Sequence, residues 1–463
     1  MALRVYNTLT RKTEDFKPLT DGEVRVYICG LTVYDDMHIG HARTYVAFDS
    51  ILRYLRYRGY RVRYIQNVTD VDDKIIKRAK ERNTRPLELS KEYARRAYED
   101  QRSLGLLEAD AYPKVTENIG GIIAATEALI RKGIAYVTEK GVYFDVSKAE
   151  GYGLLSNQDT KQLGQHRVEP DPDKRTPLDF SLWKRTGEGE LGFESPWGVG
   201  RPGWHIECTV MSQRHLGDQI DIHGGALDLI FPHHENEIAQ SEALTGKRPF
   251  VRYWMHTGFL NSSGEKMSKS LGNILAVREF LKTYSADAFR LFILQTHYRS
   301  PVDYSTQNVE NAKKAAQRLA DFKTRISFAI RSAKGSGSAA KDDVQRLRGV
   351  FDAHMDDDFN TPQAVGALFD SVRHVNAVLD AGGDSPESLT AAEAVFDDLF
   401  GVMGLRLGSG IDLTDDDKGL IKERDLQRAA KNWVESDRLR DELLKRGLKI
   451  KDQKDGSSTV ERV

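Results

Sequence analysis

The sequence predicts an α/β protein that begins with a doubly wound parallel sheet. Residues 23–29 alternate apolar and polar side chains, as a strand does, and residues 42–58 carry apolar side chains at helical spacing and end at Gly59. Residues 60–66 form a second predicted strand and residues 72–82 a second predicted helix. This alternation favours a parallel sheet, in which ligands bind at the carboxyl ends of the strands.

An insertion is predicted to interrupt the sheet at residues 113–199, where a helical pattern leads to a hairpin-like pair of strands and a long polar stretch. The sheet pattern resumes near Gly203, so the sheet domain is expected to span residues 1–112 and 200–275. The elements expected here are helices at 117–132 and 233–244 and strands at 135–137, 141–146, 219–223 and 251–256.

The rest of the chain is predicted to be mainly helical. Residues 276–331 are expected to support the loop that precedes them, and a Gly/Ser-rich linker at 332–338 is expected to lead to a helical bundle at 340–405. Residues 410–463 are expected to form a small mixed α/β domain. Its residues 418–463 contain thirteen Lys or Arg and nine Asp or Glu, an excess of about four positive charges.

The composition excludes several classes of protein. The formal net charge of the 463 residues is −1, so a nucleic-acid surface would have to be a local patch. We expect no membrane segment, because no stretch is long and apolar enough to span a bilayer and the N-terminus lacks an apolar signal core. Two cysteines are too few for a disulfide framework, which indicates a reducing compartment and a cytoplasmic protein.

The turn between the first predicted strand and helix contains His38-Ile39-Gly40-His41. Free backbone N–H groups at a helix N-terminus attract phosphate, and a glycine there lets a ligand approach the backbone closely. The turn is therefore a candidate phosphate site, although two histidines at a helix start can also be ordinary polar residues.

A candidate zinc site comes from the two cysteines and one helix. Cys29 ends the first predicted strand, and Cys208 lies where half of the twelve histidines begin to cluster. His233 and Glu237 are four residues apart, on one face of a predicted helix. Two thiolates, an imidazole and a carboxylate make a plausible zinc site. The alternative is that His233 and His234 line a polar cleft without a metal.

Lys266-Met267-Ser268-Lys269-Ser270 occurs later, in a loop flanked by glycines. Together with His38-Ile39-Gly40-His41 it resembles the paired signatures of the class I aminoacyl-tRNA synthetases, which implies a Rossmann-like catalytic domain. Other runs resemble the cysteinyl-tRNA synthetase family within that class, from about residue 5 to Pro301 and more loosely beyond. These runs are residues 6–12, 29–35, 67–74, 203–208 and 231–237.

The resemblance implies a reaction in which ATP activates L-cysteine to cysteinyl-adenylate, followed by transfer to the 3′ end of tRNA(Cys). Magnesium is expected with ATP, and one zinc per chain is expected to select the thiol of cysteine over the hydroxyl of serine. The protein is expected to be a monomer. The resemblance further implies that residues 276–331 contact the tRNA stem and that residues 410–463 bind the anticodon. We expect Trp433 in the core of that last domain rather than stacked on a base.

The resemblance also assigns site residues. The implied zinc ligands are Cys29, Cys208, His233 and Glu237, whereas His234 and Glu235 are not ligands in the family pattern. The implied ATP-binding and catalytic residues are His38, Gly40 (ATP only), His41, Lys266 and Lys269. The implied amino-acid pocket contains Gly30, Thr32, Thr69, Trp204, His223 and Asp228, with Asp228 as the candidate for the substrate ammonium. Two departures from the family pattern are Ala226, where many members have a glycine, and the absence of a terminal tryptophan.

Three alternatives remain open at this stage. A mycothiol-type ligase that joins cysteine to an amino sugar would use the same adenylate, but it would not need the basic tail. A non-catalytic RNA-binding paralogue would not need both signatures and four zinc ligands. A zinc-containing nucleotidyltransferase with another carboxylate substrate is the third.

Overall fold

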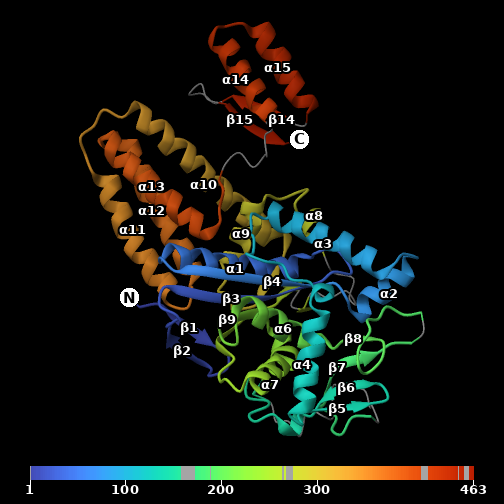
Figure 1. The fold of residues 1–463 in the computed structure, drawn as a ribbon. Coiled ribbons are helices and arrows are strands. Elements are labelled where there is room, and N and C mark those ends of the chain that lie inside the picture. The colour runs from blue at the N-terminus through green and yellow to red at the C-terminus, as the bar shows by residue number, and fades with distance from the viewer. Residues whose placement is uncertain are drawn as a thin grey trace.

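The structure is a computed structural model. It describes residues 2–157, 173–187, 189–262, 265–266, 275–407, 415–446, 448–452 and 458–462. Figure 1 shows the sheet region at the centre, a helical bundle beside it, an antiparallel sheet below it and a small C-terminal unit above.

The central sheet contains four parallel strands in the order β10-β9-β3-β4. In register, Val26 of β3 lies opposite Ile222 of β9 and Tyr64 of β4. Their bounds are β3 (Glu23–Thr32), β4 (Arg61–Thr69), β9 (Ile220–Ala226) and β10 (Val251–Thr257). The predicted parallel α/β sheet is confirmed.

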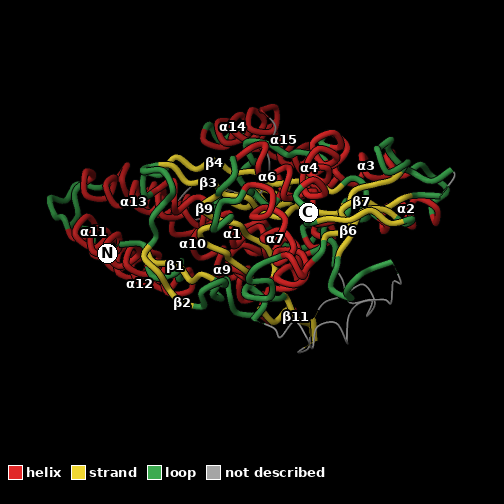
Figure 2. The backbone as a smooth tube through the Cα atoms, turned by 60° about the horizontal axis from the view of Figure 1, so that its bottom comes forward, coloured by secondary structure: helices red, strands yellow, loops and turns green. Residues whose placement is uncertain are grey.

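Helices cover both faces of this sheet (Figures 1 and 2). Because side chains alternate along a strand, Val26 and Ile28 join the apolar cluster that contains α1, while Tyr27 and Cys29 join the cluster that contains α6. The helices around the sheet are α1 (Ile39–Tyr57), α2 (Asp73–Glu81), α3 (Pro86–Ser103), α6 (Trp204–Leu216), α7 (Glu235–Thr245), α8 (Val277–Phe280) and α9 (Ala286–Leu294). The α3 helix was not among the elements that the sequence patterns identified.

The first strand is longer than predicted, and Cys29 lies inside it rather than at its end. β3 continues to Thr32 through an irregularity between Ile28 and Leu31. At this point the Gly30 N–H donates a hydrogen bond of 2.8 Å to Asn67 Oδ1, and a Cβ on Gly30 would lie 1.6 Å from the Asn67 carbonyl oxygen. Only glycine therefore fits where β3 approaches β4, and alternation alone could not reveal the bulge.

The inserted region contains a four-stranded antiparallel sheet in the order β5-β6-β7-β8, packed near helix α4. Its last strand, β8, lies just beyond residue 199, the predicted end of the insertion. The predicted helix and hairpin are confirmed, whereas β7 and β8 arise from the part that was read as a polar stretch. The bounds are α4 (Ile119–Arg131), β5 (Ala135–Thr138), β6 (Gly141–Phe144), β7 (Phe180–Arg185) and β8 (Gly200–Pro202).

Two smaller sheets flank the core. The β1-β2 hairpin contacts the edge strand β10, and β11 pairs with both β12 and β13. The bounds are β1 (Arg4–Asn7), β2 (Lys12–Asp15), β11 (Leu260–Ser262), β12 (Glu265–Lys266) and β13 (Val302–Tyr304).

The helical bundle begins before the Gly/Ser-rich segment, because α10 packs against α12 and α13. The segment at 333–338 is therefore a turn between neighbouring helices and not the flexible linker that its composition suggested. The Gly337 N–H donates a hydrogen bond of 2.9 Å to the Gly383 carbonyl oxygen in the turn between α12 and α13. The bounds are α10 (Thr306–Ser332), α11 (Ala339–Asp356), α12 (Thr361–Ala381) and α13 (Pro386–Met403).

The C-terminal unit packs on itself around Leu443, Leu448 and Ile450. Its elements are α14 (Asp415–Ala429), α15 (Trp433–Lys445), β14 (Leu448–Asp452) and β15 (Ser458–Arg462). Trp433 does not lie in the core: its exposed fraction is 58 %, and that of the neighbouring Val434 is 84 %. The expectation of a buried tryptophan was wrong, because Trp433 is the first residue of α15 and the core is formed by later turns.

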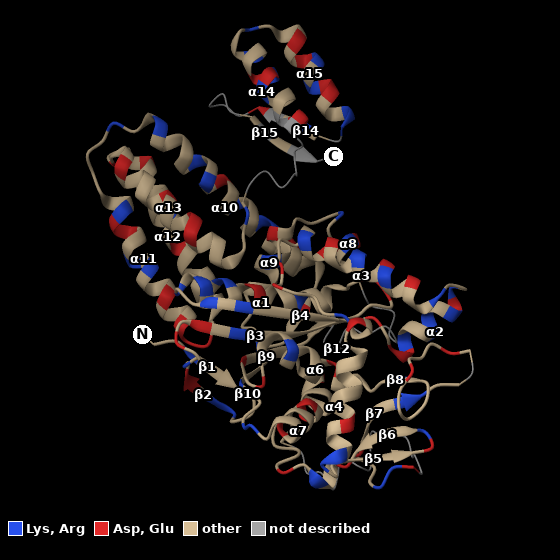
Figure 3. Cartoon of the chain, in the orientation of Figure 1, with Lys and Arg blue, Asp and Glu red and all other residues tan. Residues whose placement is uncertain are grey.

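The charge of this unit is also less positive than the tail alone suggested. Helix α14 starts at Asp415, so residues 415–463 contain thirteen Lys or Arg against twelve Asp or Glu, an excess of one. Figure 3 shows basic and acidic residues interspersed along α14 and α15. Several arginines are paired inside the unit, among them Arg424 with Asp452 and Arg438 with Glu435.

A fully buried ion pair joins the sheet domain to the bundle. Arg290 of α9 contacts the Asp49 carboxylate of α1, and its Nε donates a hydrogen bond of 2.9 Å to the Met403 carbonyl oxygen at the end of α13. Asp49 also accepts a hydrogen bond of 2.6 Å from Arg53 Nε. Arg290 therefore ties together three elements that are distant in the sequence.

Replacing Arg290 with methionine is expected to lower the free energy of unfolding by about 3 kcal/mol, because it leaves the Asp49 charge buried with less compensation. Arg53→Met is the matched control, since Arg53 binds the same carboxylate from a more exposed position, and should cost about 1 kcal/mol or less. Denaturant titration monitored by circular dichroism compares the two. Equal losses would mean that burial of the pair does not determine its contribution.

Candidate active site

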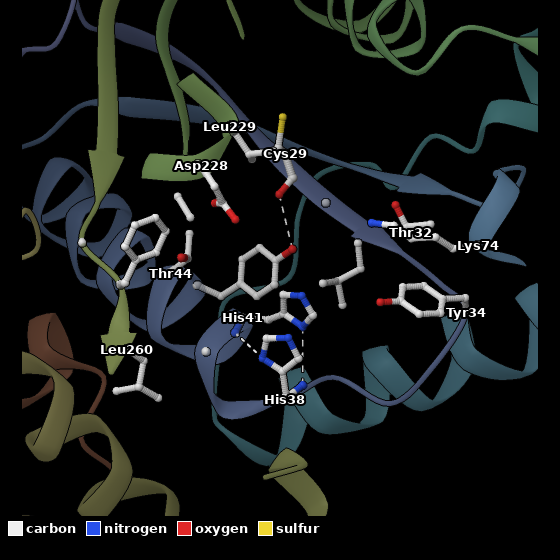
Figure 4. Close-up of a pocket in the computed structure, with 18 of the residues that line it drawn as sticks. Cys29, Thr32, Tyr34, His38, His41, Thr44, Lys74, Asp228, Leu229 and Leu260 are labelled. Atoms are coloured by element: carbon white, nitrogen blue, oxygen red, sulfur yellow. Dashed lines mark hydrogen bonds between the residues drawn. The ribbon is translucent and has the colours of Figure 1, made fainter. Parts of the chain in front are cut away.

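A cavity of about 430 Å³ lies at the carboxyl ends of the central strands, between β3, β9 and the start of α1 (Figure 4). Of the residues predicted to bind substrate or ATP, those that line it are Gly30, Thr32, His38, Gly40, His41, Trp204 and Asp228. Cys29 also lines it, so the cavity reaches the candidate metal site. Thr69 and His223 lie deeper: Thr69 donates to Glu207 at 3.2 Å, and His223 is fully buried.

The two histidines of the His38-Ile39-Gly40-His41 motif cap helix α1 and stack on each other, with ring centroids 3.5 Å apart. The His41 backbone N–H donates to His38 Nδ1 at 3.2 Å, and the His38 N–H donates to His41 Nδ1 at 3.5 Å. Because each Nδ1 is an acceptor, each neutral ring carries its proton on Nε2. The motif can therefore offer Nε2–H donors to a ligand.

The structure explains why residue 40 is a glycine, which the sequence pattern alone did not. A Cβ on this residue would lie 2.9 Å from His38 Nδ1. The glycine thus makes room for the capping imidazole. Ala226, the departure from the family pattern, has φ −85° and ψ 160°, which is extended backbone that alanine adopts without strain.

Four buried side chains converge beneath the cavity: Cys29, Cys208, His233 and Glu237. Their ligand atoms all lie within 4.8 Å of one another. His233 belongs to a π-helical turn, η4 (Ile230–His234), that precedes α7. Helix α7 therefore starts at Glu235, two residues after the predicted start at residue 233. The i, i+4 relation nevertheless holds, with His233 Nε2 3.0 Å from Glu237 Oε1.

The charge distribution in this cluster favours a cation. Burial alone raises the pKa of Cys208, but a hydrogen bond from Cys29 and the charge of His233 lower it to about 6. Burial also raises the pKa of Glu237, and His223 and His233 lower it to about 2. Burial raises the pKa of Cys29 well above its usual value. Two of the four donors are thus anionic at neutral pH. Burial lowers the pKa of His233, but the charges of Glu237 and Cys208 raise it to about 10, so a proton on His233 occupies the place that a metal cation would take.

A second set of histidines surrounds the cluster and was not assigned from the sequence. His205 Nδ1 lies 3.0 Å from His233 Nδ1, and His223 Nε2 lies 2.8 Å from Glu237 Oε2. His205 thus occupies Nδ1 of His233, and His223 occupies Oε2 of Glu237. The other atom of each ligand, His233 Nε2 and Glu237 Oε1, faces the cluster. Such outer contacts orient metal ligands. The only sequence signal was the clustering of histidines between 205 and 256.

An overlapping set, Cys29, His223, His234 and Glu237, also has its ligand atoms within 4.8 Å of one another. Histidine contacts do not separate the two sets, because His233 and His234 each have a contact at both ring nitrogens. We favour the set that contains Cys208, because its two thiols, imidazole and carboxylate are donor types that fit zinc.

The Lys-Met-Ser-Lys-Ser motif begins at the last residue of strand β12. The backbone of Lys266 lies in β12, and Lys269 lies outside the described residues. Strand β11, which pairs with β12, starts at Leu260, and Leu260 lines the cavity. The chain therefore reaches the motif directly from the cavity wall.

Comparisons with known proteins show the family to which the chain belongs. Residues 15–314 match the family described as the tRNA synthetases class I (C) catalytic domain, and residues 350–408 match the DALR domain. In fold the chain is similar to methionyl-tRNA synthetase of Mycobacterium tuberculosis (TM-score 0.62, 16 % identity, 84 % of this chain and 92 % of that one). Leucyl-tRNA synthetase of Agrobacterium radiobacter gives a TM-score of 0.63 at 12 % identity, over 85 % and 86 %. The chain is a class I aminoacyl-tRNA synthetase, and thus a ligase.

The nearly full-length relatives are more specific. Cysteine–tRNA ligase of Thermococcus gammatolerans is 47 % identical over 99 % of this chain and 98 % of its own length. That of Caldicellulosiruptor saccharolyticus is 45 % identical over the whole of both chains. The chain therefore belongs to the cysteine–tRNA ligase family. Among the described residues, none of the helices combines the length and the apolar character that crossing a membrane requires.

Proposed function

We propose that this chain activates L-cysteine with ATP to cysteinyl-adenylate and transfers the cysteinyl group to the 3′ end of tRNA(Cys), with zinc selecting the substrate thiol. The observation that carries the proposal is the position of Cys29, which belongs both to the buried Cys29–Cys208–His233–Glu237 cluster and to the wall of the cavity at the His38–His41 motif. A metal ligand and a phosphate-binding turn thus share one cavity.

We propose Cys29, Cys208, His233 and Glu237 as the residues that hold the zinc. The chemistry that bound zinc supplies is tight coordination of a thiolate, whereas a serine hydroxyl is a poor ligand. This matters because a merely apolar pocket separates near-isosteric substrates poorly. His205 and His223 keep the two non-sulfur ligands oriented, as their contacts of 3.0 Å and 2.8 Å support.

The activation step needs charge stabilisation and positioning rather than a protein nucleophile. Asp228 is proposed to bind the substrate ammonium, with Gly30, Thr32, Thr69, Trp204 and His223 forming or supporting the amino-acid pocket. His38 and His41 donate from Nε2 to the phosphates of ATP. Gly40 is proposed to let ATP approach the backbone closely, and it leaves room for the His38 imidazole. Lys266 and Lys269 bind the departing pyrophosphate, and magnesium accompanies ATP.

The regions outside the catalytic domain are proposed to bind tRNA. Residues 1–112 and 200–275 form the catalytic domain, and residues 113–199 are inserted in it. Residues 276–331 contact the tRNA stem, residues 340–405 form the bundle together with α10, and residues 410–463 bind the anticodon. The protein is proposed to act as a monomer in the cytoplasm. Because the C-terminal unit has little net charge, its recognition would rest on stacking rather than on charge.

Of the three alternatives, the amino-sugar ligase is the runner-up, because it would use the same cysteinyl-adenylate. The DALR match and the described C-terminal unit favour a tRNA substrate over it. The converging ligands and intact motifs argue against a non-catalytic RNA-binding paralogue. The family match makes a nucleotidyltransferase with another carboxylate substrate the weakest candidate.

The test is amino-acid-dependent ATP–pyrophosphate exchange with each of the twenty amino acids, alongside elemental analysis for zinc and aminoacylation of tRNA(Cys). Exchange with cysteine, about one zinc per chain and charging of tRNA are expected. Cysteine exchange without tRNA charging would favour the amino-sugar ligase. A lack of exchange with every amino acid would favour the paralogue.

Trp433→Ala is expected to raise the KM for tRNA about tenfold, because stacking of a base on an aromatic ring contributes about 1–3 kcal/mol. The same change should leave pyrophosphate exchange unchanged, since Trp433 lies outside the catalytic domain. Leu426→Ala, at another apolar position whose exposed fraction is 56 %, is the matched control. An unaltered KM in the Trp433 variant would show that this side chain does not contact tRNA.

A further inference from the structure

Lys74 has no role in the function proposed above, yet it lines the same cavity. Among the described residues that line the cavity, Lys74 is the one Lys or Arg, and Asp228 is the one Asp or Glu. Figure 4 shows the two on different walls, with the Lys74 ammonium group beside Thr32 and directed inward. A lysine in this position can bind an anion that enters the cavity.

The position of Lys74 is set by its helix. Lys74 is in the first turn of α2, and its backbone N–H donates a hydrogen bond of 2.8 Å to Asp72 Oδ1, the N-cap. Beside it, Asp73 pairs with Lys184 of β7 at 3.1 Å and with Arg201 of β8. These contacts hold the first turn of α2 where the cavity meets the inserted sheet.

The side chain of Lys74 is held near the cavity by the segment that follows β3. Its Nζ lies 5.8 Å from the ring centroid of Tyr34, within range of a cation–π interaction. The next residue, Asp35, pairs with Arg78 of α2 at 3.2 Å. The ring and the helix that carries the lysine are therefore fixed relative to each other.

The wall on which Lys74 lies suggests which anion it binds. Leu260, at the start of the chain segment that leads to Lys266, is on the other side of the cavity in Figure 4, and His38 and His41 lie between the two sides. The triphosphate of ATP is assigned to the histidines and to that segment. The first turn of α2, which carries Lys74, lies next to the inserted sheet instead, and a second substrate could enter on that side beside the adenylate.

We propose that Lys74 binds a phosphodiester of the 3′-terminal nucleotides of tRNA and so positions the terminal ribose for transfer. The inference rests on the proposed function, because it needs tRNA as the second substrate. Lys74 is then a binding residue of the transfer step, and Asp72 and Asp73 hold its helix in place.

Lys74→Met is expected to lower the single-turnover rate of transfer from preformed adenylate at subsaturating tRNA about tenfold or more, as for the loss of one charge-assisted contact. Any loss in cysteine-dependent pyrophosphate exchange should be about tenfold smaller. Lys74→Arg should recover most of the transfer rate. Lys80→Met is the matched control, since Lys80 is exposed like Lys74 but lies in the last turn of the same helix and does not line the cavity.

Salt dependence separates a phosphate contact from a structural effect. The slope of log kcat/KM for tRNA against log salt concentration should become less steep by about 0.7 in Lys74→Met and should not change in Lys80→Met. With a tRNA whose last phosphodiester is an uncharged methylphosphonate, wild type and Lys74→Met should have equal transfer rates.

Two results would overturn the inference. One is a transfer rate and salt slope in Lys74→Met equal to those of wild type. The other is an equal loss in exchange and transfer, which would assign Lys74 to ATP or to the adenylate. Failure of the proposed function itself would look different, because the wild-type protein would then show no cysteine-dependent exchange.

Discussion

Replacing Cys208 with alanine is expected to reduce bound zinc from about one ion per chain to a small fraction and to lower cysteine-dependent pyrophosphate exchange by more than about 100-fold. Loss of an outer-shell partner alone typically costs about 10–100-fold in metal affinity or activity, and Cys208 is proposed as a direct ligand. The remaining set, Cys29, His233 and Glu237, contains one thiol. Selectivity for cysteine over serine should fall together with the metal content.

Elemental analysis and exchange assays with cysteine and serine measure these effects. Ser212→Ala is the matched control, because Ser212 is fully buried on the same helix, its Oγ donates to the Thr209 carbonyl oxygen at 3.1 Å, and it is not one of the four clustered ligands. The control should keep its zinc. If the Cys208 variant retained full zinc content and full activity, the proposed ligand set would be wrong.

Replacing His41 with alanine is expected to lower the rate of pyrophosphate exchange about 100–1000-fold, as found when one donor to a developing negative charge is removed. His41 also caps α1 through Nδ1, so some effect on stability is expected, of about 1 kcal/mol. The two roles belong to different ring nitrogens and can be separated.

Asparagine places a polar atom near the position of Nδ1, and glutamine places one near the position of Nε2. If Nε2–H donates to phosphate, His41→Gln should retain more exchange activity than His41→Asn. His41→Asn should instead retain more of the thermal stability that the cap of α1 provides. Measuring exchange and thermal unfolding of both variants tests this assignment. Better exchange by His41→Asn would mean that the histidine acts through the cap and not through phosphate.

The sequence alone was sufficient for the parallel sheet and for the candidate ligands, because both depend on local patterns. Alternation and helical spacing specified β3 and α1 to within a few residues, and the i, i+4 spacing of His233 and Glu237 survives the π-helical turn. The motif pair also indicated the class of protein without any three-dimensional information.

Tertiary structure decided the features that depend on contacts between distant segments. The bulge at Gly30 exists because β3 approaches Asn67 of β4, which alternation within one strand cannot reveal. The Gly/Ser-rich segment is an interhelical turn because it bonds to Gly383, 46 residues beyond Gly337. Trp433 is exposed because the core of its unit is formed by other residues.

Contacts between distant segments also determine the candidate active site. Cysteine and histidine identities suggested four ligands, but only the fold brings His205 onto His233 and His223 onto Glu237, across separations of 28 and 14 residues. Lys74 ends the run 67–74 that resembles the family, but the sequence assigned it no role, since a lysine in an amphipathic helix is normally a solvated residue. Its place in the wall of the cavity follows from how α2 is anchored to the inserted sheet, which only the packing of the whole domain determines.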